Sequence, residues 1–105
     1  TGIKDIRALD GMPLEHLRLA YLEIKDITPL SFAQLRSLDI SFTKVRDLSP
    51  IKGMTNLRHL FIKGTDVKSL EPIRSLPIEI LFVDNPELHR KVLQDMPALK
   101  RLNVW

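Results

Sequence analysis

The sequence contains no cysteine and only a few glycines and aromatic residues, and its shortages exclude several classes of function. Without cysteine, the 105-residue chain forms no disulfide bond and offers no thiolate to a metal ion. No apolar run approaches the roughly 18 residues of a membrane-spanning helix, so we expect no membrane insertion. Lysine and arginine are spread along the chain and the net charge is only +3, so we expect no nucleic-acid partner.

What the sequence does have is leucine and isoleucine at regular spacing. The pattern L-x-x-L-x-L restarts every 21 or 22 residues. Its five starting positions are Leu14, Leu35, Leu57, Ile78 and Leu99. The alternation within L-x-L predicts a short strand whose side chains point inward and outward in turn. Because one such unit cannot bury its own apolar face, we expect the units to stack on one another.

The second half of three units contains a proline. We interpret the residue before each proline as the N-cap of one short 3₁₀ turn, with proline as the first helical residue. These pairs are Thr28-Pro29, Ser49-Pro50 and Glu71-Pro72. The fourth unit differs, because DNPELHRKVLQDMP (84–97) predicts a true helix capped by Asn85. Leu88, Val92 and Met96 would form one apolar stripe on that helix.

Two further columns recur once per unit. A large apolar residue precedes each strand and is expected in the core: Met12, Phe32, Met54, Leu76 and Met96. A threonine follows the strands at Thr1, Thr43 and Thr65. A hydroxyl at that place is predicted to be buried and to satisfy backbone groups where the chain turns away from the sheet.

This pattern resembles the leucine-rich repeat, in the short 21–22-residue bacterial type of internalin-like proteins. The phrases ITPL, DLSPI and SLEPI are similar to the convex segment of that type, and SFTKV and KGTDV carry threonine in place of the usual asparagine. The resemblance implies an α/β fold: a right-handed leucine-rich-repeat solenoid with a parallel concave sheet and 3₁₀ turns or short helices on its convex side. Residues 1–105 would form one such domain of about four and a half repeats.

The chain opens in the middle of a unit. TGIKDIRALDGM (1–12) aligns with TKVRDLSPIKGM (43–54), but no strand-like run precedes the first copy. Repeat arrays need terminal units that cover the open core, so we expect the chain to be the C-terminal fragment of a longer array. The alternative is a natural start at Thr1, with Ile3, Ile6 and Leu9 folded over as a cap.

The outward side chains of the predicted sheet are the candidate binding residues, since the resemblance implies that partners bind the concave face. Phe61 and Phe82 are expected on adjacent strands about 4.8 Å apart, where with Ile80 they form an apolar cluster that fills no core. We interpret the two phenylalanines as central anchors. The complete predicted set is Phe61, Phe82, Ile80, Arg18, Asp39, His59, Lys63 and Trp105.

No catalytic, metal or cofactor site is predicted. Ser37, His59 and Asp39 superficially resemble a catalytic triad, but neighbouring strands would hold them nearer 5 Å apart than the roughly 3 Å that proton transfer needs. His16 and His59 fall two strands apart, about 10 Å, so they cannot converge on one zinc ion. Surface polar residues are the better interpretation of all of them.

The sequence therefore favours a non-catalytic module that binds a protein or peptide across its concave face. Two alternatives stay open: a structural spacer or stabilising array that binds nothing, and a regulatory tail of a larger signalling protein such as a kinase. A monomer is expected, with an edge-to-edge dimer as the alternative. The compartment is undecided between the cytoplasm, which is slightly favoured, and the cell surface.

Overall fold

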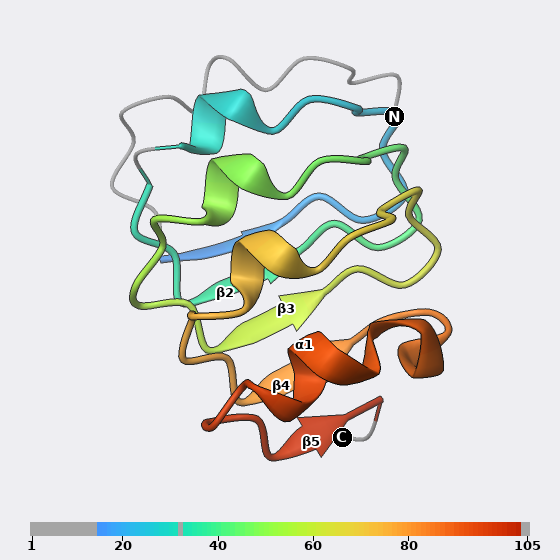
Figure 1. Cartoon of the computed structure of the whole chain (residues 1–105). Coiled ribbons are helices and arrows are strands. Elements are labelled where there is room, and N and C mark those ends of the chain that lie inside the picture. The colour runs from blue at the N-terminus through green and yellow to red at the C-terminus, as the bar shows by residue number, and fades with distance from the viewer. Residues whose placement is uncertain (1–14, 32, 104–105) are drawn as a thin grey trace.

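The computed structural model describes residues 15–31 and 33–103, which wind into a coil of successive turns (Figure 1). Each turn adds one short strand to a single parallel sheet with the order β1-β2-β3-β4-β5. The strands are β1 (His16–Arg18), β2 (Ser37–Asp39), β3 (His59–Phe61), β4 (Ile80–Phe82) and β5 (Arg101–Leu102).

The strand register confirms the repeat that the sequence predicts. Leu17 pairs with Leu38, Leu38 with Leu60, and Leu60 with Leu81, so equivalent positions of each unit lie side by side. The leucines of β2, β3 and β4 are fully buried, whereas their neighbours in the same strands are half-buried. The period-2 alternation therefore divides each strand between the core and the open face of the sheet.

Three 3₁₀ turns stack on the other side of the core, as the prolines predict (Figure 1). They are η2 (Thr28–Leu30), η3 (Ser49–Ile51) and η4 (Glu71–Ile73). The predicted capping residues are wrong by one position, because each turn already includes the residue before proline. Its free N–H is instead accepted by a side chain two residues upstream: Thr28 donates to Asp26 Oδ1 at 2.8 Å and Ser49 to Asp47 Oδ1 at 2.9 Å.

This local hydrogen bonding affects the acidity of one carboxylate. The Ser49 hydroxyl and the Ser49 backbone N–H both donate to Asp47 and lower its pKa below the usual aspartate value. The equivalent place in the next turn is occupied by Ser69, whose Oγ accepts the Glu71 N–H at 3.2 Å. In each of these three turns, a side-chain oxygen of aspartate or serine therefore accepts the N–H of the first residue, in place of a conventional N-cap.

The fourth unit does contain the predicted helix, but in two parts. It starts as a 3₁₀ turn, η5 (Pro86–His89), and continues as a short α-helix, α1 (Arg90–Gln94). Val92 and Met96 are buried as expected, whereas the prediction for Leu88 is wrong, because its side chain is 79% exposed. A 3₁₀ turn has three residues per turn rather than 3.6, so Leu88 rotates away from the stripe that the two other residues form.

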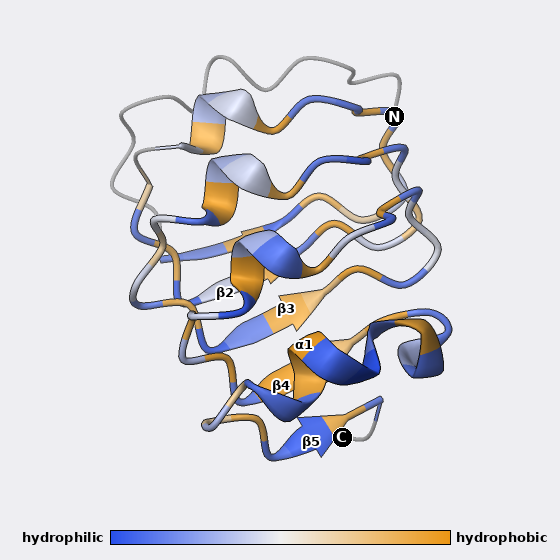
Figure 2. Ribbon diagram, in the orientation of Figure 1, coloured by the Kyte–Doolittle hydropathy of each residue, from blue (hydrophilic) through white to orange (hydrophobic). Residues whose placement is uncertain are grey.

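The core runs along the coil between the strands and the convex turns. In Figure 2 the hydrophobic segments recur at matching places in successive turns. Met54, Leu76 and Met96 are buried, which confirms the predicted column, while Met12 and Phe32 lie outside the described residues. Each fully buried leucine or methionine contributes about 1.5–3 kcal/mol through removal from water.

The threonine column is also confirmed where the structure describes it. Thr43 is buried, and its Oγ1 donates to the Ile40 carbonyl at 2.7 Å. Thr65 makes the same bond to Ile62, also at 2.7 Å. Thr1 lies outside the described residues. Each hydroxyl closes the tight corner at which the chain leaves the sheet.

Candidate functional site: the concave face and its rim

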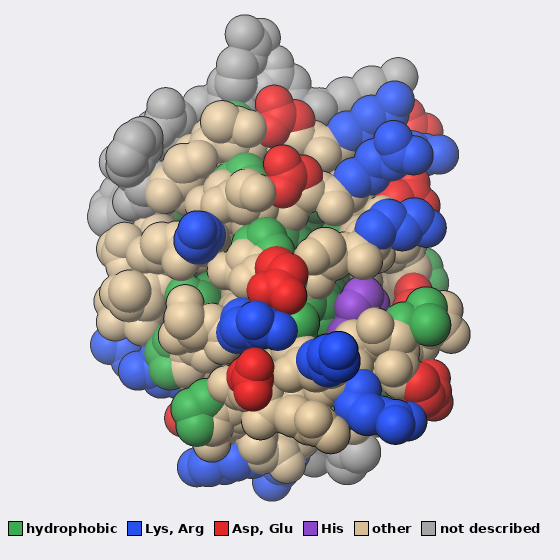
Figure 3. All heavy atoms as spheres, viewed as in Figure 1, with side chains coloured by type: hydrophobic (Ala, Val, Ile, Leu, Met, Phe, Trp, Pro, Cys, Tyr) green, Lys and Arg blue, Asp and Glu red, His purple; other side chains and the backbone are tan. Residues whose placement is uncertain are grey.

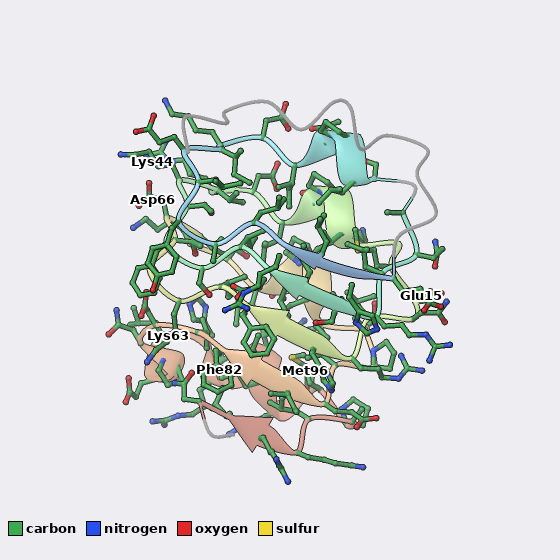
Figure 4. The ribbon with its side chains drawn as sticks, turned by 180° about the vertical axis from the view of Figure 1, so that it is seen from behind. Glu15, Lys44, Lys63, Asp66, Phe82 and Met96 are labelled. Carbon is green, nitrogen blue, oxygen red and sulfur yellow. The ribbon has the colours of Figure 1, made fainter. Side chains whose placement is uncertain are left out.

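The open face of the sheet brings the predicted binding residues together. Figure 4 shows this face, with Phe82 and Lys63 labelled on it. His59 lies beside Ile80, and Asp39 lies between Arg18 and Phe61 in the strand register. Trp105 lies outside the described residues. Coming together on one face is a matter of geometry, and the role of these residues in binding stays a prediction.

Phe61 and Phe82 form a stacked pair at the centre of this face. Their ring centroids are 5.2 Å apart and the ring planes differ by 29°. Both side chains are half-buried, as is Ile80 in the neighbouring row. Stacked aromatic pairs contribute about 0.5–1.5 kcal/mol beyond the area that they bury. Both rings are therefore covered in part and accessible in part.

Polar groups border the pair on the side of the earlier strands. Arg18 Nε lies 3.6 Å from Asp39 Oδ2, while Asp39 Oδ1 accepts the Ser41 N–H at 3.0 Å. The Arg18 side chain is 84% exposed, so this ion pair is worth about 0–1 kcal/mol. The carboxylate is fixed by the backbone, whereas the guanidinium remains accessible.

A shallow hollow of about 330 Å³ lies between these groups. Its wall is made by side chains of β1, β2 and β3: His16, Leu17, Arg18, Ser37, Asp39 and Phe61. It combines an aromatic ring, two basic side chains and a carboxylate within one open depression. Such a hollow is large enough to receive a side chain of a partner protein.

A second aromatic pair, Tyr21 and Phe42, lies on the rim where the strands end. The rings stack almost in parallel, with centroids 5.0 Å apart and planes 9° from each other. Tyr21 is 70% exposed and Phe42 is 53% exposed. Their positions on the rim follow from the repeat, but the stack and its backbone conformation were not predicted. We call this pair the rim ledge.

The rim ledge stands on an unusual backbone. Tyr21 and Phe42 have φ values of 67° and 59°, in the left-handed region. The equivalent corners of the next two turns are Gly64, with φ 74°, and Asn85, with φ 47°. Glycine and asparagine adopt this conformation readily, whereas a bulky aromatic residue rarely does. The sequence signal that reveals the corner is therefore Gly64 and Asn85, not the aromatic residues.

Gly64 also provides the surface on which the ledge rests. A Cβ atom at this position would lie 2.4 Å from Cδ1 of Phe42, so the phenyl ring packs directly over the glycine. The Gly64 N–H donates to Asp84 Oδ2 at 2.6 Å, which holds the corner from the following turn. The rim ledge thus consists of the Tyr21 and Phe42 rings, and the Phe42 ring lies directly on the backbone of Gly64.

The geometry gives little support to a chemical reaction at this face. Ser37 and His59 are register partners, but no hydrogen bond joins their side chains. Among residues 15–31 and 33–103, no cluster of histidine, aspartate and glutamate is arranged to hold a metal ion. In that same part of the chain, no helix is long and apolar enough to cross a membrane.

The opposite side of the molecule has a different surface. On the face seen in Figure 3, acidic and basic side chains are mixed and hydrophobic side chains show only in small areas. Arg74, which directly follows η4, lies 3.2 Å from Glu71 and 3.6 Å from Asp95. Ion pairs of this kind therefore accompany the 3₁₀ turns.

The solved structures that are similar to this chain include two internalins. One is an internalin (inlF) from Listeria monocytogenes, with a TM-score of 0.89 and 24% identity over 96% of this chain and 32% of its own. Another is an internalin C2 (inlC2) from the same organism, with a TM-score of 0.81 and 24% identity over 94% of this chain and 46% of its own. This chain thus spans about a third of the first internalin and just under half of the second.

No family model matches the sequence, and no curated protein is similar to it. The likeness therefore rests on the structure, and at this identity it concerns the fold. The parallel sheet, the 3₁₀ turns and the 21–22-residue unit agree with it in every described turn. The chain has the fold of an internalin-like leucine-rich-repeat solenoid.

Proposed function

We propose that this chain is a non-catalytic module that binds a protein or peptide across its concave face. The observation that carries the proposal is the Phe61–Phe82 pair, which stacks on the outward side of the sheet. Aromatic residues that are only partly covered, with charged groups around them, are typical of the energetic centre of protein interfaces. Arg18, Asp39 and His59 supply such groups here.

The hollow beside the pair supports the same function. Phe61 forms one wall of the depression, so a side chain inserted there contacts an aromatic ring and basic groups together. A spacer has no need of an apolar outward surface, because exposed apolar area lowers solubility. The hollow beside the polar residues is open to solvent rather than enclosed, and this favours recognition over catalysis.

An affinity pull-down from native lysate tests the proposal. The 105-residue chain serves as bait beside its Phe61→Ala/Phe82→Ala form. We expect the double variant to fold, because both rings lie outside the core, and to lose a protein that the unmodified chain enriches. Circular dichroism and thermal melting establish that the variant is folded.

The matched control is Leu88→Ala, which removes an exposed apolar side chain of η5, outside the sheet that carries the aromatic pair. This variant should retain the partner. Equal recovery by the unmodified chain and the double variant contradicts the concave-face proposal, and empty lanes for both favour a structural spacer. Unfolding of the double variant would show that the two rings belong to the core.

A further inference from the structure

The rim ledge combines an unfavourable backbone conformation with high exposure to solvent. A left-handed backbone is unfavourable for a residue with a bulky side chain, yet two consecutive turns place aromatic residues there. The equivalent corners use Gly64 and Asn85. Burial does not offset the cost, since both rings are more than half exposed. Strained residues of this kind gather at binding sites.

The ledge is close enough to the central pair to share one partner. Phe42 packs on Gly64, and Gly64 follows Phe61 by three residues, a backbone distance of at most about 11 Å. A standard interface covers about 800 Å² on each protein, which is much wider than this separation. One bound segment is therefore long enough to contact both aromatic pairs.

A cation lies between Phe61, the last residue of the third strand, and the corner on which Phe42 rests. Lys63 lies two residues after Phe61 and directly before Gly64, and its side chain is half-buried. Figure 4 shows Lys63 near the carboxyl ends of the strands, on the same face as Phe82. Within the described part of the chain, Lys63 makes no ion pair, whereas Asp39 is paired with Arg18 and Asp84 accepts the Gly64 N–H.

The chemistry between the pairs favours an anionic group. Lys63 follows Phe61 by two residues, and Asp84, the charged residue at the equivalent place after Phe82, already accepts the Gly64 N–H. The ring edges that a stacked pair presents carry partial positive charge, which reinforces the preference of the ammonium for a carboxylate. Apolar side chains of a partner would cover the two pairs on either side of this charge.

We infer that the partner presents a carboxylate flanked by two large apolar side chains. The carboxylate binds Lys63, one apolar side chain packs on Phe61 and Phe82, and the other packs on the ledge of Tyr21 and Phe42. This inference rests on the proposed function, because it specifies the chemistry of the partner for that same face. It adds a second anchor outside the concave sheet.

A library of random twelve-residue peptides displayed on phage is the probe for this arrangement. Selection on the immobilised 105-residue chain should enrich peptides in which aspartate or glutamate lies between two aromatic or large aliphatic residues. The dissociation constant of a synthetic copy of an enriched peptide is then measured by calorimetry for the unmodified chain and four variants, one of which is the Phe61→Ala/Phe82→Ala form already described. Circular dichroism confirms that each variant is folded.

Each variant tests one part of the arrangement. Tyr21→Asn/Phe42→Asn removes the ledge with a residue that tolerates the left-handed corner, and Lys63→Glu reverses the central charge. Both should weaken binding about tenfold or more, as expected for anchor residues. Leu88→Asn, the matched control, should leave the affinity unchanged. Selection on the Lys63→Glu chain should favour lysine or arginine in place of the acidic residue.

The outcomes separate this inference from the function on which it rests. Peptides that need Phe61 and Phe82 but tolerate the ledge and Lys63 variants would overturn the inference alone. Peptides that bind regardless of Phe61 and Phe82, or the absence of any enriched peptide, would overturn the concave-face function and the inference with it. Enriched peptides without an acidic residue would also contradict the role of Lys63.

Discussion

The two stacked aromatic pairs look alike but arise differently. Their centroid distances are 5.2 Å for Phe61–Phe82 and 5.0 Å for Tyr21–Phe42. The first pair stands on regular strands, where parallel pairing places equivalent residues about 4.8 Å apart without further cost. The second stands on left-handed corners. Stacking alone therefore does not distinguish the two pairs, whereas their backbone and their surroundings do.

What distinguishes the rim ledge is its local cost. It requires two aromatic residues at positive φ and a glycine beneath the second ring. The central pair requires neither, and its partly covered rings lie beside the hollow. The rim ledge is therefore distinguished by backbone strain and exposure, and the central pair by its position in the sheet. Three sets of substitutions test this distinction.

Gly64→Ala should have the largest effect. The new Cβ would lie 2.4 Å from the Phe42 ring at a φ of 74°, so we expect the free energy of unfolding to fall by about 2 kcal/mol, as measured by urea denaturation. In a Phe42→Ala background the overlap disappears and the cost should drop to about 1 kcal/mol. Gly53→Ala is the matched control, because nothing lies within 4 Å of its Cβ, and it should not destabilise the chain.

Equal costs in the two backgrounds would contradict the idea that Gly64 is needed for the ledge. They would instead assign the whole requirement for glycine to its backbone conformation. A stabilising Gly64→Ala substitution would show that the left-handed corner itself is wrong.

Thr43→Val should have an intermediate effect. The substitution removes the hydroxyl that donates to the Ile40 carbonyl at the corner holding Phe42, and leaves a buried acceptor unpaired. We expect a loss of about 1 kcal/mol in thermal or urea unfolding. Thr65→Val, at the Gly64 corner, should cost a similar amount because its bond has the same length. A neutral result at both positions would contradict a role of the hydroxyls in closing the corners.

Phe42→Asn should have the smallest effect on stability. It loses the stacking contact, worth about 0.5–1.5 kcal/mol, but relieves a left-handed strain of about 1 kcal/mol, so the net change should be near zero. Phe61→Asn loses its stack with no such relief and should cost more. Similar losses for the two substitutions in the same urea titration would remove the distinction between the pairs.

Much of the architecture was predictable because it depends on spacing. The distances between equivalent leucines predict the register, and alternation within L-x-L predicts which strand residues face inward. The burial of Met54 and the hydroxyl bond of Thr43 follow from the same repeat. Periodicity reports the side of the coil on which a residue lies, and this also places Phe61 and Phe82 on the open face.

The failures concern conformations that spacing does not encode. Helical periodicity assumes 3.6 residues per turn, so it misplaces Leu88, which lies in a 3₁₀ turn. The proline signal locates each convex turn but not the carboxylate of Asp26 or Asp47 that satisfies its first N–H. An aromatic residue gives no sign of a positive φ in the sequence, so only Gly64 and Asn85 indicate the left-handed corners.

The stacked Tyr21 also makes the rim visible to spectroscopy. It is the only tyrosine of the chain, so its ring protons are identifiable in a proton NMR spectrum without full assignment. With the Phe42 ring 5.0 Å away and nearly parallel, ring currents should shift these resonances from their random-coil positions. The molecule therefore carries a built-in reporter at its rim, which a bound peptide would perturb at the place where the second anchor is proposed.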